Sequence, residues 1–104
     1  MNWAHYAIEK LKNGQAAELT PHGNSMIPHI YSGEKIYIVP FTKEFAEHQP
    51  IKKGDIVLAK VKGSVILHMV VGLDKHRGFL IANAKGRENG WTNTIYGKFI
   101  RKIS

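Results

Sequence analysis

Apolar residues near the start of the chain recur at the spacing of an amphipathic helix. The residues that fall on one face are Trp3, Ala7, Ile8 and Leu11. Asn2 can cap the start of such a helix, and Gly14 suits a left-handed stop. The pattern predicts one helix over residues 2–13, and Trp3 and Leu11 are expected to anchor it on a sheet.

After this segment the apolar residues come in short runs, several of which alternate with polar residues as strands do. Lys62-Gly63-Ser64 between two runs predicts a hairpin turn, and a bend is expected at Gly97. The expected strands are 16–20, 34–39, 55–61, 65–72, 79–83 and 94–103. Residues 41–50 and 84–93 are expected to be connections. One helix and many short strands indicate a mostly β fold, a small coiled antiparallel β-domain.

The length and composition place the chain among single-domain globular proteins. It has 104 residues and no Cys, which excludes disulfides, thiolate catalysis and Cys-based zinc sites. Its apolar runs are only a few residues long, and its N-terminal segment lacks the apolar stretch of a secretory signal peptide. We therefore expect a protein that is located in the cytoplasm and has no membrane anchor.

Positive charge is concentrated in the second half of the chain. The net charge is +7, and residues 1–51 hold four Lys or Arg against five acidic residues, a balance of −1. Residues 52–104 hold eleven Lys or Arg against three acidic residues, a balance of +8. Such a half favours a polyanionic partner such as nucleic acid, but it is more often the mark of a Lys-rich soluble surface. No nucleic-acid-binding motif accompanies it.

A single Ser stands in a loop that Gly and Pro restrict on both sides, within the sequence Gly23-Asn24-Ser25-Met26-Ile27-Pro28. A second turn, Ser32-Gly33-Glu34, leads into the next strand. Such a loop can hold one hydroxyl in a fixed direction, as a nucleophilic Ser requires. The same composition is typical of a tight connection in a β-protein, and taken alone the loop favours this structural interpretation.

Histidines supply the other candidate chemistry. A lone residue such as His68 in an apolar strand is usually half-buried and bonded to a carbonyl, but it can also activate a Ser as a general base. Residues 85–93 combine charged side chains, amides and a Trp, and suit either a long hairpin connection or a segment that orients the imidazole. His22 and His29 flank Ser25, but their spacing fits no standard zinc pattern. No metal and no cofactor are expected.

Taken together, these segments resemble the LexA-repressor and signal-peptidase superfamily of serine peptidases. The matching motifs, in chain order, are Gly23 to Pro28 with Ser32 to Ile36, Lys53-Gly54-Asp55-Ile56-Val57, His68-Met69-Val70-Val71-Gly72, and Gly97-Lys98. The resemblance covers roughly residues 19–103. The residues from Asn83 to Trp91 are similar to those of short stand-alone bacterial and phage members, often described as phage-repressor-like.

The resemblance implies a fold and a set of site residues. It implies one peptidase-like domain over residues 1–104, with a LexA C-terminal or signal-peptidase type β core over 19–103 after the helix. Ser25 would be the nucleophile and His68 the general base, as in the archaeal and endoplasmic-reticulum signal peptidases. The backbone at Asn24, Ser25 and Met26 would supply the oxyanion hole.

The chain departs from the family in the segment that should orient the His. Arg87 and Asn93 stand where the Ser-His signal peptidases have Asp, and Met69 stands where an Arg usually follows the His. Asn93 can still accept a hydrogen bond from the imidazole, and Glu88 is an alternative orienting residue.

Two functions remain open. One is a serine peptidase with a Ser-His dyad that acts on a peptide or protein substrate in trans, because only one helix precedes residue 20 and no segment suited to self-cleavage is expected. The other is a catalytically inactive phage-type or regulatory module of the same fold. That module would bind a protein or nucleic acid through the basic second half.

Overall fold

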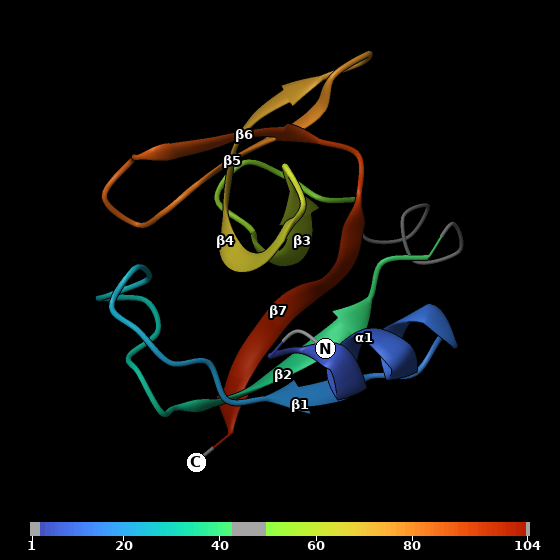
Figure 1. The fold of residues 1–104 in the computed structure, drawn as a ribbon, viewed down its shortest axis with the longest axis vertical. Helices are drawn as coiled ribbons and strands as arrows, with labels where there is room; N and C mark the ends of the chain where they lie inside the picture. The colour runs from blue at the N-terminus through green and yellow to red at the C-terminus, as the bar shows by residue number, and fades with distance from the viewer. Residues whose placement is uncertain (1–2, 43–49, 104) are drawn as a thin grey trace.

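The computed structural model describes residues 3–42 and 50–103 of the chain. Within these ranges the chain forms one short helix and seven strands (Figure 1). The elements are α1 (His5–Lys12), β1 (Ala17–Leu19), β2 (Lys35–Pro40), β3 (Ile56–Val61), β4 (Ser64–Asp74), β5 (Gly78–Ala82), β6 (Glu88–Thr92) and β7 (Ile95–Ile103). The mostly β fold expected from the sequence is confirmed. Residues 43–49 of the predicted connection lie outside the described residues.

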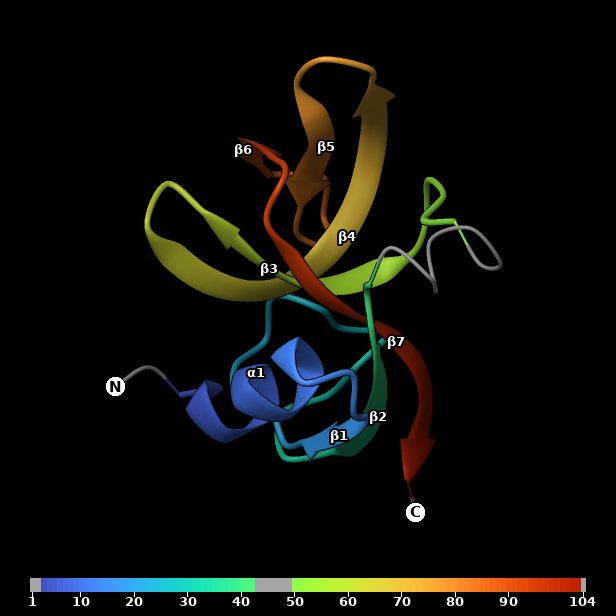
Figure 2. The same cartoon turned by 90° about the vertical axis from the view of Figure 1, so that its right-hand side faces the viewer.

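The described strands form one antiparallel sheet in the order β1-β2-β7-β3-β4-β5-β6. β4 pairs with β3 along its first half and with β5 along its second half, so the sheet curls through this strand. Figure 2 shows α1, β1 and β2 at one end of the molecule and the curved β3–β4 pair with β5 and β6 at the other. β7 joins the two ends because it pairs with both β2 and β3.

The helix covers the β1–β2 end of the sheet but begins later than the sequence predicted. Its buried side chains are Ala7, Ile8 and Leu11. Burial of a Leu or Ile side chain contributes about 1.5–3 kcal/mol, which makes Ile8 and Leu11 the main anchors. Trp3 contacts the sheet through a hydrogen bond and not through burial: it precedes the helix, is 50% exposed, and donates its indole N–H to the carbonyl oxygen of Val65 on β4 at 3.0 Å. Asn2, the expected cap, lies outside the described residues.

β6 lies in a stretch that was predicted to be a connection, so that prediction was wrong for residues 88–92. The stretch is rich in Gly and Asn, which are poor strand formers, yet it pairs with β5 along its length. Trp91 provides the packing: a Cβ at Gly72 would lie 3.4 Å from its ring, and the guanidinium of Arg77 stacks on it at 4.1 Å. Contacts with neighbouring strands therefore make these residues a strand, although their local preference is for a turn.

The core extends over both faces of β3, because alternate residues of this strand enter two different clusters of buried side chains. The cluster under α1 includes Leu11, Ile36, Ile38 and Leu58, and the other includes Val57, Ala59, Val70 and Ile81. β7 crosses the first cluster so closely that a Cβ at Gly97 would lie 2.6 Å from Ile38 Cγ2 and 2.7 Å from the Val39 carbonyl oxygen. This position therefore accepts only Gly without displacement of β2.

The predicted hairpin turn is present between β3 and β4. Lys62 and Gly63 both have positive φ angles, 50° and 85°, as a two-residue turn that follows the right-handed twist of the strands requires. The turn sets the register of the two strands, which pairs Val57 with His68. The local chemistry of the turn thus determines where the imidazole lies along the sheet.

Candidate active site

Ser25 lies in the Ser25 loop (residues 20–34), which joins the paired strands β1 and β2. The loop is closed at its base, where the N–H of Gly33 donates to the carbonyl oxygen of Pro21 at 2.9 Å. Its two buried anchors are Met26 and Ile30, which are 4% and 2% exposed. Because the base and the middle of the loop are both fixed, Ser25 is held in place while its side chain stays exposed.

A second set of bonds holds the end of the Ser25 loop. The N–H of Gly23 donates to Ser32 Oγ at 3.0 Å, and the N–H of Tyr31 donates to Glu34 Oε1 at 2.6 Å. The Nζ of Lys102 lies 3.1 Å from the same carboxylate oxygen. The hydrogen bond from Tyr31, and after it the bond from Lys102, lower the pKa of the Glu34 carboxyl below its ordinary value. The carboxylate is therefore ionised at neutral pH and keeps the turn closed.

Two backbone N–H groups around Ser25 make no hydrogen bond within the described part of the chain. The N–H of Ala84 donates to the Ser25 carbonyl oxygen at 2.9 Å, which ties the Ser25 loop to the chain just after β5. The Asn24 carbonyl oxygen accepts from the N–H of Ile27 at 3.3 Å in the turn that follows. No hydrogen bond among the described residues uses the N–H of Ser25 or Met26. Such neighbouring donors suit an oxyanion.

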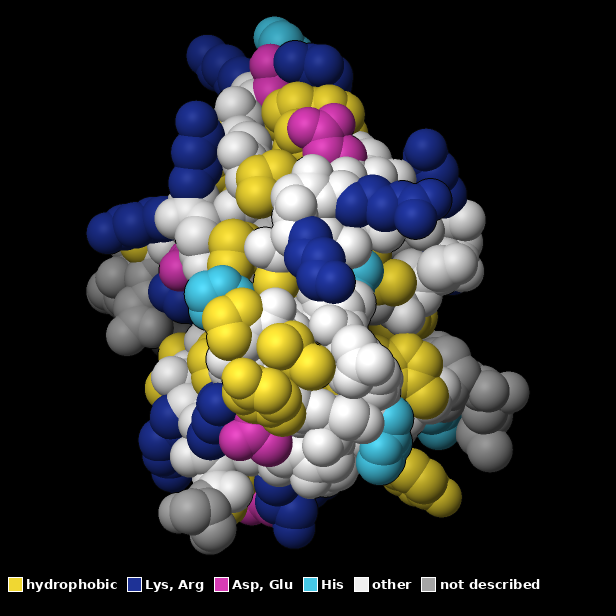
Figure 3. Space-filling view, turned by 90° about the vertical axis from the view of Figure 1, so that its left-hand side faces the viewer, with side chains coloured by type: hydrophobic (Ala, Val, Ile, Leu, Met, Phe, Trp, Pro, Cys, Tyr) yellow, Lys and Arg dark blue, Asp and Glu magenta, His cyan; other side chains and the backbone are white. Residues whose placement is uncertain are grey.

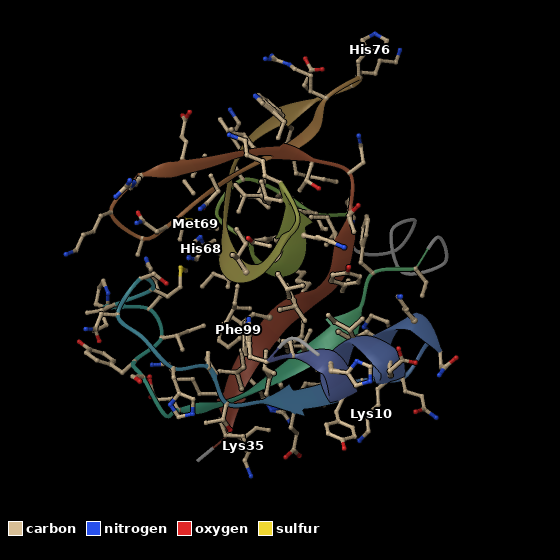
Figure 4. The ribbon with its side chains drawn as sticks, in the orientation of Figure 1. Lys10, Lys35, His68, Met69, His76 and Phe99 are labelled. Carbon is tan, nitrogen blue, oxygen red and sulfur yellow. The ribbon has the colours of Figure 1, made fainter. Side chains whose placement is uncertain are left out.

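His68 projects from β4 toward the Ser25 loop, and its Nε2 lies 3.0 Å from Ser25 Oγ. Figure 4 labels His68 on the side of the molecule that carries this loop. The residue is half-buried, and β4 is paired there with β3 through Val57 and His68. The structure therefore brings together the two residues that the sequence selected, although they are 43 positions apart, at a distance that suits proton transfer.

The other ring nitrogen of His68 identifies the tautomer. Its Nδ1 lies 2.7 Å from Asn89 Oδ1. An amide oxygen can only accept, so Nδ1 carries the proton. In the neutral imidazole Nε2 is then the acceptor, and it faces the hydroxyl of Ser25. This is the arrangement that a general base requires before it receives the proton of a nucleophile.

Asn89 is the residue that orients the imidazole of His68, a role for which the sequence analysis named Asn93 and Glu88. β6 pairs Gly90 with Ile81 and Glu88 with Ala82, so Asn89 is an extra residue in a β-bulge. A bulge re-aims one side chain out of the regular alternation, and here that side chain reaches His68. Glu88 is exposed, and no hydrogen bond or ion pair involving its side chain is present among the described residues.

Asn93 lies elsewhere. Its Oδ1 lies 2.5 Å from the position of a Cβ on Gly78, at the start of β5 and therefore at the other end of the hairpin. The sequence contained one indirect signal for Asn89: it belongs to the stretch from Asn83 to Trp91 that resembles the phage-repressor-like proteins. Nothing in the sequence indicates the β-bulge that places Asn89, and not one of its neighbours, beside His68.

The short connection between β5 and β6 is organised by one side chain. Asn83 Oδ1 accepts from the N–H groups of Lys85 and Arg87 at 3.0 and 2.9 Å, and the Asn83 N–H donates to the Arg87 carbonyl oxygen at 3.0 Å. Arg87 is exposed. The role of this connection is therefore to fix the start of β6, one residue before Asn89.

A pocket of about 180 Å³ adjoins the two side chains. Its described lining residues include Ser25, His68 and the apolar Met26, Ile30, Val65 and Leu67, with Trp3 and Tyr31 at exposed positions. None of the described lining residues is acidic, Lys or Arg. Figure 3 shows hydrophobic side chains gathered in the middle of the face that carries the Ser25 loop, with Lys and Arg spread around them. The pocket therefore suits an uncharged group.

Neither a metal cluster nor a membrane-spanning helix is found in the described part of the chain. No group of three or more His, Asp or Glu side chains that could hold a metal ion occurs there. His22 is exposed and lines the pocket. His29 is exposed too. No described helix is long and apolar enough to cross a membrane.

Comparison of the chain with protein-family models, with curated proteins and with solved structures found no match.

Proposed function

We propose that this protein is a serine peptidase of the LexA and signal-peptidase type, with Ser25 as the nucleophile and His68 as the general base. The observation that carries the proposal is the continuous chain of contacts from Ser25 Oγ to His68 Nε2 at 3.0 Å and from His68 Nδ1 to Asn89 Oδ1 at 2.7 Å. The order of motifs along the chain supports the same assignment.

The reaction follows from this arrangement. Ser25 Oγ attacks the carbonyl carbon of the scissile bond while its proton passes to His68 Nε2. The N–H groups of Ser25 and Met26, next to Asn24, donate to the resulting oxyanion, and one such donor typically accounts for about 10²–10³ in rate. His68 then gives the proton to the leaving amine, and a water molecule activated by the same nitrogen releases the acyl group from Ser25.

An open sheet edge beside the pocket supports a peptide substrate. On β4 the N–H and C=O of Val70 bond to the β3 side, to Asp55 and Gly54. Because these directions alternate along an antiparallel strand, the backbone groups of Val65 and Leu67 face the opposite side. β5 pairs with β4 only from Met69 onward, so no described strand pairs with the edge at Leu67, which lines the pocket and is where an extended peptide chain would pair.

Labelling with a small fluorophosphonate tests the proposal directly. We expect stoichiometric modification of the wild-type protein, seen by intact mass, and none in Ser25→Ala. Loss of a general base typically costs about 10²–10⁴ in rate, so His68→Ala should label at least about 100-fold more slowly. Ser64→Ala removes another exposed Ser and should label at the wild-type rate. Equal labelling of the wild type and Ser25→Ala would refute the proposal.

The alternative, an inactive module that binds nucleic acid through its basic half, has less support. The Lys and Arg side chains in Figure 3 are spread around the face and do not join into one patch. Two described guanidinium groups, those of Arg77 and Arg101, already stack on Trp91 and Tyr37. Phosphate contacts would make nucleic-acid binding fall steeply between low and moderate salt. Such binding by a protein that no fluorophosphonate labels would favour this alternative.

A further inference from the structure

A side chain from the start of the chain touches the open edge of β4. The indole Nε1–H of Trp3 donates to the Val65 carbonyl oxygen at 3.0 Å, although the two residues are 62 positions apart. Trp3 is 50% exposed, and it lines the same pocket as Ser25 and His68. It therefore occupies an acceptor that a peptide chain paired with this edge would otherwise use.

The position of this contact along β4 determines how much of the edge remains open. Starting from His68, the outward-facing backbone groups belong first to Leu67 and then to Val65. Each strand residue spans about 3.3 Å, so the indole meets a paired peptide about three residues from the bond beside Ser25. Among the described residues no hydrogen bond uses the outward-facing backbone groups of Leu67, whereas the carbonyl oxygen of Val65 accepts from Trp3.

We infer that Trp3 is a specificity-determining residue that ends the substrate-pairing edge at Val65 and limits productive contacts to about three residues of the substrate. We assign these residues to the acyl side of the scissile bond, because the acyl segment stays attached to Ser25 until water releases it and needs support for longer. Residues beyond the third gain no backbone bond and meet the indole ring. The inference rests on the proposed peptidase activity.

A length series of active-site-directed peptides tests the inference. Peptidyl diphenyl phosphonates carrying one to six Ala residues on the acyl side modify a nucleophilic Ser, and the second-order rate constant is read by intact mass. For the wild type we expect the rate constant to rise up to about three residues and then to level off or fall. For Trp3→Ala it should continue to rise, by about tenfold between three and five residues, because up to two new backbone hydrogen bonds form at Val65.

Three controls keep the outcomes separate. The small fluorophosphonate, which has no peptide, gives the intrinsic labelling rate of each variant, and each peptide rate constant is divided by that rate. Tyr6→Ala removes an aromatic ring that is 82% exposed and absent from the described pocket lining, and should keep the wild-type length profile. Trp3→Phe removes the donor but keeps a ring for packing, and it decides the matter if Trp3→Ala fails to fold.

Each outcome bears on one of the two proposals. A longer optimum in Trp3→Ala, or in Trp3→Phe if the Ala variant unfolds, supports the inference. Identical length profiles in the wild type and both Trp3 variants overturn it while leaving the peptidase proposal intact, provided that the small probe labels Ser25. A wild-type rate constant that does not change with the number of residues on the acyl side also overturns the assignment. Failure of the small probe overturns both.

Discussion

Asn89 is the residue whose substitution tests the active-site geometry most sharply. It is uncharged, and its Oδ1 accepts from His68 Nδ1 at 2.7 Å. A neutral hydrogen bond contributes about 0.5–1.5 kcal/mol net, and 1.4 kcal/mol is a factor of ten in rate. Asn89→Ala leaves the imidazole free to rotate and to place its proton on Nε2. We therefore expect fluorophosphonate labelling of Ser25 to slow by about 3- to 10-fold.

Asn89→Asp should have the opposite effect. A carboxylate keeps the acceptor in place and adds a charge that stabilises the imidazolium formed during attack. Charge-assisted hydrogen bonds are roughly twice as strong as neutral ones, so labelling should accelerate by up to about tenfold. Both rate constants are measured at several probe concentrations by intact mass, after circular dichroism shows that the variants retain the wild-type fold.

A matched control distinguishes this geometry from the interpretation based on sequence. Asn93 carries the same side chain but lies beside Gly78, away from His68. Asn93→Ala should therefore label within about twofold of the wild type. If Asn89→Ala labels at the wild-type rate, or if Asn93→Ala slows as much as Asn89→Ala, the contact between Asn89 and His68 has no catalytic role and the reasoning is refuted.

Two further predictions concern the scaffold of the site. Gly97→Ala forces a Cβ to within 2.6 Å of Ile38 Cγ2. Overpacking of this kind typically costs about 1–3 kcal/mol, so the urea midpoint of unfolding should fall. An unchanged midpoint would show that β7 can move away from β2 at no cost. The pKa of Glu34 is lowered mainly by the N–H of Tyr31. The carboxylate therefore stabilises the fold at pH values above its ordinary pKa of about 4.3, and this contribution is lost as the pH falls through the lower pKa of the folded state. Glu34→Gln should therefore unfold more easily than the wild type at pH 7, and the difference should disappear in acid; a difference that is the same at pH 7 and in acid would contradict this linkage.

The short-range features of the fold could be predicted from the sequence because they depend on neighbouring residues. The helix, the β3–β4 hairpin and its turn at Lys62 and Gly63 follow from hydrophobic periodicity and from backbone preferences. β6 could not be predicted in this way, since its Gly and Asn residues favour turns. It becomes a strand because β5 offers a partner and Trp91 packs beside Gly72.

The candidate site also has a part that could be predicted from the sequence and a part that could not. Ser25 and His68 could be selected from the sequence because each stands in a distinctive local setting, a Gly- and Pro-restricted loop and an apolar strand. Their separation of 3.0 Å depends on the register of β4 and on the bond that ties Ala84 to the Ser25 loop. These contacts link distant parts of the chain, so only the folded structure determines them.

Asn89 and Trp3 show what tertiary structure alone decided. Asn89 orients the imidazole because a bulge between β5 and β6 shifts the pairing by one residue, and a one-residue shift changes which side chain reaches the site. Trp3 was expected to pack the helix on the sheet, and the fold places its indole N–H on β4 beside the pocket. The sequence by itself determined which chemical groups are available, through residue types and local backbone preferences. Tertiary structure decided which of these groups meet, because strand register and packing depend on residues far apart in the chain.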